Sequence, residues 1–326
     1  MPSIKKICVL VIITIFCLSS AFAENGSEAS GFSLSPLVGF LYGKADEIVY
    51  RDALLDYYVS HLIWDLKPLS YVGISAGFGP LSPFSKNGFT ANLSLKAGLP
   101  FVTGKLEDWD WMNFDFDFPT HFSFHDTYSM GTVLADLSAG YSLRFNNYLS
   151  LSVYGEFSYM YLSWVAQNGY TQYPDIKLQA SYPPWDDSLE KYYLNGRVIE
   201  YLQNWFILSP GISLKFRAVP VFSLEGAFNY TPLIYCADRD WHILRNVVFF
   251  DYLFFGHYFS GSGKLTIFPD KNVSFFLSAS YRNISDSRGF TTIGSDIYTD
   301  TAGAGYSAYS FEISCRIRIP GKTGTR

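Results

Sequence analysis

Large apolar residues occupy every second position in several stretches of this chain. The clearest case is residues 149–158 (LSLSVYGEFS), and residues 32–40 and 309–318 follow the same rule with mostly Ser, Gly, Glu or Arg between. A period of two predicts β-strands with one apolar and one polar face. Because lipid contacts one face of a membrane barrel and a polar interior contacts the other, this pattern indicates a transmembrane β-barrel.

Turn-forming residues divide these stretches at regular intervals. Short turns rich in Pro, Asn, Asp or Ser are expected at residues 80–87, 146–147, 218–220 and 269–272. Longer polar or aromatic connections are expected at residues 51–56, 113–123, 169–195, 243–247 and 285–303. The sequence therefore predicts an all-β fold, an antiparallel transmembrane β-barrel of about ten strands with long extracellular loops and short periplasmic turns.

The N-terminal residues have the pattern of an export signal. Lys5 and Lys6 precede an apolar run over residues 7–18, and residues 21–23 (AFA) match a cleavage site. Residues 1–23 are therefore predicted to be a signal peptide, and residues 24–326 a single outer-membrane barrel domain. The chain is 19% aromatic and 16% charged, and no later apolar run reaches the roughly 20 residues of a membrane helix.

Charge and cysteine content narrow the function classes. A formal net charge of −5 argues against nucleic-acid binding and favours basic partners. Cys236 and Cys315 are too few and too far apart to predict a disulfide framework. A metal site at Cys236, Asp238 and His242 lacks the usual ligand spacing, so no metal is expected.

Two acidic stretches are candidates for chemistry. Asp108 and Asp110 are two positions apart, and Asp238, Asp240 and His242 follow the same spacing, which places each set on one face of a strand. With the N-terminus in the periplasm, odd-numbered strands end at the extracellular rim. Both stretches end odd strands, as does Glu47, so the topology predicts that all three clusters meet at that rim. The third and seventh strands are nearly opposite in a ring of about ten.

The alternation of side chains tests this prediction. The apolar face of the third strand, with Leu93, points Asp108 and Asp110 inward, and the apolar even positions of the first strand turn Glu47 inward. In the seventh strand, however, the large residues at 222–230 would turn Asp238 to His242 outward. A β-bulge at residues 231–232 would reverse this orientation, and Pro232 is the kind of residue found at bulges.

These residues could hydrolyse a bond with an activated water. His242 is the expected general base and Asp240 the group that orients its ring. Asp108 and Asp110 would share a proton and hold the water from the other side. Glu47 and Asp238 would receive an arginine or lysine side chain.

Most of these residues could instead have no catalytic role. An isolated Asp-x-Asp is commonly a solvated strand edge, and residues 115–117 repeat the pattern without evident purpose. The remaining histidines are expected in loops or in the aromatic girdle: His61, His121, His125 and His257.

Four motifs in order resemble those of the omptin family. They are residues 43–50 (GKADEIVY), 59–64 (VSHLIW), 108–112 (DWDWM) and 238–242 (DRDWH), with weaker likeness at 125–127 and 163–169. The resemblance covers essentially the whole chain after the signal. It implies a ten-stranded outer-membrane protease with its active site in the extracellular mouth.

Residue by residue, the resemblance implies that Asp240 and His242 are the catalytic dyad and that Asp108 and Asp110 are the facing pair. It further implies that Glu47 and Asp238 bind a basic side chain, so that peptides and proteins with Arg or Lys would be the substrates. No cofactor is implied, but omptins depend on lipopolysaccharide, held by basic residues on the middle strands.

Three departures from the family pattern leave points open. The acidic residue expected on the other side of the cleaved bond is not matched, because His121 or a neighbour falls there. Residues 157–161 and 203–205 contain no arginine, which leaves the activating lipid open. The chain also continues past Ile319 into a polar tail. The alternative function is a catalytically silent barrel of the same type that acts as an adhesin or surface-binding protein.

Overall fold

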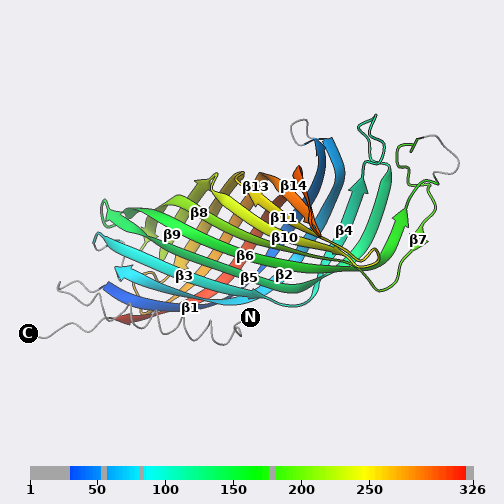
Figure 1. Cartoon of the computed structure of the whole chain (residues 1–326). Coiled ribbons are helices and arrows are strands. Elements are labelled where there is room, and N and C mark those ends of the chain that lie inside the picture. The colour runs from blue at the N-terminus through cyan, green and yellow to red at the C-terminus, as the bar shows by residue number, and fades with distance from the viewer. Residues whose placement is uncertain (1–29, 53–56, 81–83, 85, 176–180, 321–326) are drawn as a thin grey trace, which may run out of the picture.

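The structure, a computed structural model, describes residues 30–52, 57–80, 84, 86–175 and 181–320. The predicted signal peptide lies outside the described residues. The strands form a closed antiparallel ring of ten, which confirms the predicted barrel (Figure 1). In ring order the strands are β1 (Ser30–Asp52), β2 (Tyr57–Pro80), β3 (Gly88–Gly98) with β4 (Val102–Asp110), β5 (His121–Arg144), β6 (Leu149–Gln172), β8 (Arg197–Val219), β9 (Phe222–Thr231) with β10 (Ile234–His242), β11 (Val247–Phe254) with β12 (His257–Ile267), β13 (Val273–Ile293) and β14 (Asp296–Pro320); the short β7 (Tyr192–Tyr193) pairs with β6 outside the ring.

The outer surface of the barrel carries a belt of apolar side chains. Pairing of β1 with β14 closes the ring, so neighbouring strands within it can satisfy one another's backbone groups without water. Aromatic pairs across neighbouring strands reinforce the belt, including Phe40 with Phe311 at 5.3 Å between ring centroids. The belt includes Val38, Val72, Leu137, Val153, Leu208, Ile212, Leu224, Phe228, Leu277 and Ile313, all exposed. No helix in the described part of the chain is long and apolar enough to cross a membrane.

The two ends of the barrel differ. Short turns at residues 145–148, 220–221 and 268–272 lie at one end, close to where β1 begins and β14 ends, as predicted. At the other end the β1–β2 and β4–β5 hairpins and the chain around β7 extend beyond the ring (Figure 1). The predicted loop at residues 285–303 is wrong, because β13 and β14 continue through it and leave a turn of two residues. Strands that extend into water on both faces lose the alternation by which a membrane strand is recognised.

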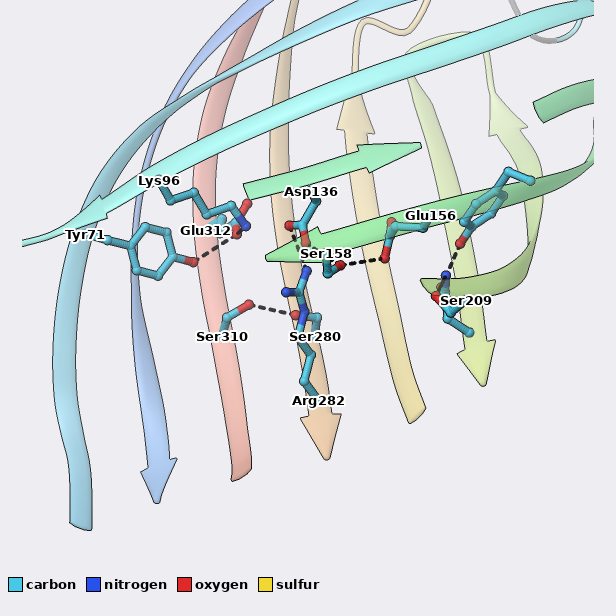
Figure 2. A network of polar contacts seen from close by, with 12 residues as sticks. Tyr71, Lys96, Asp136, Glu156, Ser158, Ser209, Ser280, Arg282, Ser310 and Glu312 are labelled. Atoms are coloured by element: carbon cyan, nitrogen blue, oxygen red, sulfur yellow. Dashed lines mark hydrogen bonds and ion pairs between the residues drawn. The ribbon is translucent and has the colours of Figure 1, made fainter. Parts of the chain in front are cut away.

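A polar network crosses the interior of the barrel in its lower half, the half that ends in the short turns (Figure 2). Arg282 Nη2 donates to Asp136 Oδ2 at 2.8 Å, Tyr71 donates to Glu312 at 2.9 Å, and Lys96 pairs with the same glutamate. These groups and their neighbours line a cavity of about 460 Å³ that begins near the first residues of β1. Buried charges in a barrel are stable only when paired in this way.

An apolar layer separates this cavity from the upper end. On β1 the cavity lining stops at Leu37, and Leu41 and Ala45 follow as buried inward residues before Glu47. At the top of the layer the ring of Trp64 stacks on Tyr201, with 5.3 Å between centroids. The end of the barrel opposite the short turns is therefore separated from this cavity by a packed aromatic layer.

The β9–β10 junction contains the predicted bulge. Gly211 and Ile207, four residues apart on β8, pair with Asn229 and Ile234, which are five residues apart. Pro232 and Leu233 both face outward, so the alternation reverses at this point. Below the bulge the even positions face outward, and above it Asp238 and Asp240 face inward. The prediction of a bulge that reorients this stretch is confirmed.

Deletion of Leu233 tests the role of the bulge. Removing the extra residue should turn residues above it to the opposite face, so that the buried thiol of Cys236 becomes exposed. In protein that begins at Glu24 and carries Cys315→Ser, Cys236 is the sole cysteine. We expect its maleimide labelling to accelerate by about tenfold or more after the deletion, because a side chain changes face completely. The control Leu233→Ala keeps the residue count and should remain unlabelled; equal labelling of both proteins would contradict the assignment.

Candidate active site

The acidic residues lie above the apolar belt. At their level the outward side chains become polar or charged, among them Lys44 and Asp46 on β1, Glu200 on β8 and Arg239 on β10. Charged side chains are strongly disfavoured against hydrocarbon. This part of the barrel therefore stands clear of the membrane core.

Three strands bring the predicted residues into one cluster. Asp108 and Asp110 come from β4, Asp238, Asp240 and His242 from β10, and Glu47 from β1. Glu47, Asp108, Asp238 and Asp240 are each less than a tenth exposed. Asp108 and His242 come from strands that are not neighbours in the ring, yet they lie close enough for the charge of His242 to act on the carboxyl of Asp108. The spatial meeting of the two stretches is as predicted, except that β1 continues five residues beyond Glu47.

His242 and Asp240 form a close pair on one wall of the cleft. Nε2 of His242 lies 2.5 Å from Oδ2 of Asp240. The other ring nitrogen, Nδ1, accepts a hydrogen bond from Nη2 of Arg245 in the turn that follows β10. Because a guanidinium can only donate, this contact fits the tautomer of His242 that carries its proton on Nε2, toward Asp240.

Asp108 is held by two hydroxyl groups on the facing wall. Ser60 Oγ and Ser123 Oγ donate to its two oxygens at 3.2 and 3.1 Å. Ser123 also lies 3.1 Å from Nε2 of His125, whose Nδ1 donates to the backbone oxygen of Asn168 at 2.5 Å. One serine hydroxyl carries one proton. Because Nδ1 of His125 already donates to Asn168, Nε2 can donate to Ser123 only in the imidazolium form; in the neutral ring Nε2 accepts from Ser123, and a protonated Asp108 must then donate to Ser123. Ser123 thus couples the protonation of His125 to that of Asp108.

Burial and like charges disfavour ionisation of these acids. Burial and the charge of Asp108 raise the pKa of Asp110 well above its usual value. Burial also raises the pKa of Asp108, against the opposing effects of His242, Ser123 and Ser60. Two buried carboxyl groups that repel each other retain a proton more readily than either would alone.

A second group of carboxyls lies beside the dyad. Asp251 on β11 is directly opposite Asp238 in the β10–β11 register, and the two side chains hydrogen-bond. Burial, followed by the charges of Asp240, Asp238, Asp251 and Asp108, raises the pKa of Glu47. Burial, opposed by a hydrogen bond from Thr291, raises the pKa of Asp251 to about 6. No three His, Cys, Asp or Glu residues in the described ranges are arranged to hold a metal ion.

Sequence reasoning missed four members of the site: Ser60, Ser123, His125 and Asp251. The expectation that His125 belongs to the girdle or a loop is wrong, because it is buried beside Ser123. An available signal for Asp251 was its place in a hairpin, since a four-residue turn after His242 pairs 251 with 238. Ser60 and Ser123 face Asp110 and Asp108 across β2 and β5, a register that the sequence does not reveal.

His121 lies near the other end of the cleft. Its ring is 4.7 Å from those of Tyr173 and Tyr182, centroid to centroid, and burial lowers its pKa. Tyr173 also lies within reach of the charges on Asp108 and Asp110. Aromatic rings therefore surround His121 on the side of the site near Asp110.

Comparison with known proteins adds independent information. The chain matches the model of the Omptin family over residues 28–318. Among solved structures it is similar to the outer membrane protease OmpT from Escherichia coli, with a TM-score of 0.78, 17% identity and coverage of 91% of this chain and 99% of that one. At that identity the similarity shows the fold.

Other similarities are weaker. The translocator domain of the autotransporter NalP from Neisseria meningitidis has a TM-score of 0.38 at 10% identity, covering 96% of each chain. The toluene transporter TodX from P. putida has 0.35 at 8% identity, covering 91% of this chain and 92% of that one. Scores this low carry no argument about this chain, and no curated protein sequence matches it. Because the family model spans most of its length, the chain belongs to the omptin family and is an outer-membrane β-barrel protease that hydrolyses peptide bonds.

Proposed function

We propose that this omptin cleaves peptide bonds next to arginine or lysine residues, with a water activated by His242 and Asp240 in the extracellular mouth of the barrel. The observation that carries the proposal is the close pair of His242 and Asp240, which lies near buried Asp108 and beside the buried carboxyls of Glu47 and Asp238. The resemblance of the motifs at 108–112 and 238–242 to those of the family supports the same roles.

The tautomer of His242 with its proton on Nε2 suits a general base. Its Nε2 proton points at Asp240, and its Nδ1 lone pair is available once the exposed side chain of Arg245 moves into solvent. Proton transfer from water to Nδ1 would create an imidazolium, which the adjacent carboxylate of Asp240 stabilises. The hydroxide equivalent formed in this way would attack the carbonyl carbon of the substrate.

Asp108 and Asp110 would position that water from the opposite wall. An ionised Asp108 can accept a hydrogen bond from the water, whereas Asp110, with its raised pKa, can donate one. Ser123 is an unsuitable nucleophile even though it lies beside His125, because its side chain is buried and directed at Asp108. A serine-protease mechanism is therefore disfavoured relative to attack by water.

Glu47 and Asp238 would bind the basic side chain on the N-terminal side of the cleaved bond, the P1 residue. Both are buried, and Glu47 Oε2 and Asp238 Oδ1 have no hydrogen-bond partner within the described structure. An unpaired buried carboxylate is costly, so a cation that supplies donors gains both charge attraction and hydrogen bonds. Partners are therefore basic peptides or proteins, with nucleic acid disfavoured by charge.

Substitution of His242 and of Asp108 tests the proposed catalytic roles. We expect His242→Ala and Asp108→Asn to lower kcat for an Arg-containing fluorogenic peptide by about 100-fold or more, the usual contribution of acid–base groups, while KM changes little. Kinetics would be measured on folded protein in lipid vesicles. Arg239→Gln is the matched control, because Arg239 lies on the same strand with its side chain on the outer face. Equal turnover in all variants, or none in folded wild type, would refute the proposal and favour the adhesin alternative.

Substitution of the pocket tests substrate recognition. Glu47→Gln and Asp238→Asn should each lower kcat/KM for Arg and Lys peptides by about 10- to 100-fold, because each removes a charge-assisted hydrogen bond. Peptides with norleucine at P1 should change far less. A uniform loss for charged and neutral peptides, measured side by side, would instead indicate a general effect on the site.

The raised pKa values predict the pH dependence of recognition. As the pH falls through a raised pKa, the carboxyl takes up a proton and loses its attraction for a cation. With the pKa of Asp251 at about 6 and those of Glu47 and Asp238 also raised, the preference for Arg over norleucine should fall by about tenfold between pH 8 and 5. The measurement is the ratio of kcat/KM for the two peptides across this range; a constant ratio would show that the pocket stays ionised.

A further inference from the structure

Asp251 is a third buried acid in the pocket assigned to the P1 residue. It lies on β11 next to β10, and its side chain faces Asp238 across the pair of strands. Only 3% of Asp251 is exposed. Three neighbouring carboxyls on three strands, Glu47, Asp238 and Asp251, therefore enclose one end of the cleft.

Each of the three carboxyls has an oxygen without a partner. Glu47 Oε2, Asp238 Oδ1 and Asp251 Oδ1 are buried and accept no hydrogen bond within the described structure. Hydrogen bonds hold two of these side chains in place: Tyr201 donates to Asp238 Oδ2 at 3.1 Å, and Thr291 hydrogen-bonds to Asp251. Buried polar atoms rarely remain unsatisfied, so three together indicate that a ligand supplies the missing donors.

Resting on the function proposed above, we propose that Asp251 makes this pocket selective for arginine over lysine at P1. A guanidinium presents five N–H donors in one plane and can serve two or three carboxyls from a single position. An ammonium group carries its charge at one point and is more strongly hydrated, so it loses more free energy on entering a buried pocket. A pocket with only Glu47 and Asp238 would discriminate less between the two cations.

The competing interpretation is that Asp251 only shares a proton with Asp238. In that case Asp251 would set the charge of Asp238 without contacting the substrate. Its replacement would then alter binding of arginine and lysine by the same factor. The two interpretations therefore differ in the ratio of the two substrates rather than in the size of either effect.

The kinetic test uses peptides identical except for Arg, Lys or norleucine at P1. We expect wild type to favour Arg over Lys, and Asp251→Asn to lower kcat/KM for Arg by about 10- to 100-fold but for Lys by only about threefold. The change should fall on KM, because the residue contacts a part of the substrate remote from the reacting bond. Asp126→Asn is the control, since it removes an equal charge from the outer face of β5.

A binding measurement separates this inference from the proposed function. Calorimetric titration of His242→Ala protein with argininamide and lysinamide requires no turnover. Tighter binding of argininamide that Asp251→Asn abolishes supports the selectivity role even if no peptide is cleaved. Equal losses for both ligands, or no loss for either, would overturn it, whereas absence of cleavage by wild type would count only against the proposed function.

Discussion

The burial of several carboxyl groups inside one closed ring of strands is the constraint on which this site depends. Carboxylates in contact with one another repel, and removal from water penalises each charge further. The ring keeps Asp108, Asp240 and Glu47 inward because each is fixed by backbone pairing on both sides of its strand. Burial and mutual repulsion therefore raise the pKa values of Glu47, Asp110 and Asp238 in this cluster.

The balance of charge inside the barrel changes along its axis. In the lower half the charges are matched, as in the pair of Arg282 with Asp136 and that of Lys96 with Glu312. In the upper half the acids outnumber the cations that face them. The aromatic layer containing Trp64 and Tyr201 separates the two regions and prevents the lower cations from neutralising the upper acids. The barrel therefore combines a charge-matched interior near the short turns with an acidic interior at the opposite end.

The sequence predicted the barrel from its alternation, and the orientation of most site residues from the same rule. The sequence-based prediction failed at residues 285–303, which were expected to form a loop but continue β13 and β14; around the turn, residues 294–300 are exposed on both faces of the hairpin. It also failed for His125, because the partner of a buried histidine depends on which strands are neighbours and in what register. The contact of Arg245 with the imidazole of His242 was likewise not predictable from the sequence, because it arises from the geometry of the turn after β10.

By itself, the sequence determined the fold class, the strand rhythm and the inward direction of Glu47, Asp108 and Asp110, and Pro232 marked a position where a bulge was possible. These follow from local rules, since the period of a strand and the conformation of proline act over a few residues. Only the tertiary structure decided that Ser123 lies between His125 and Asp108 and that Asp251 lies opposite Asp238. Those relations link separate strands across hydrogen-bonded registers, and a register is fixed only when the whole ring closes.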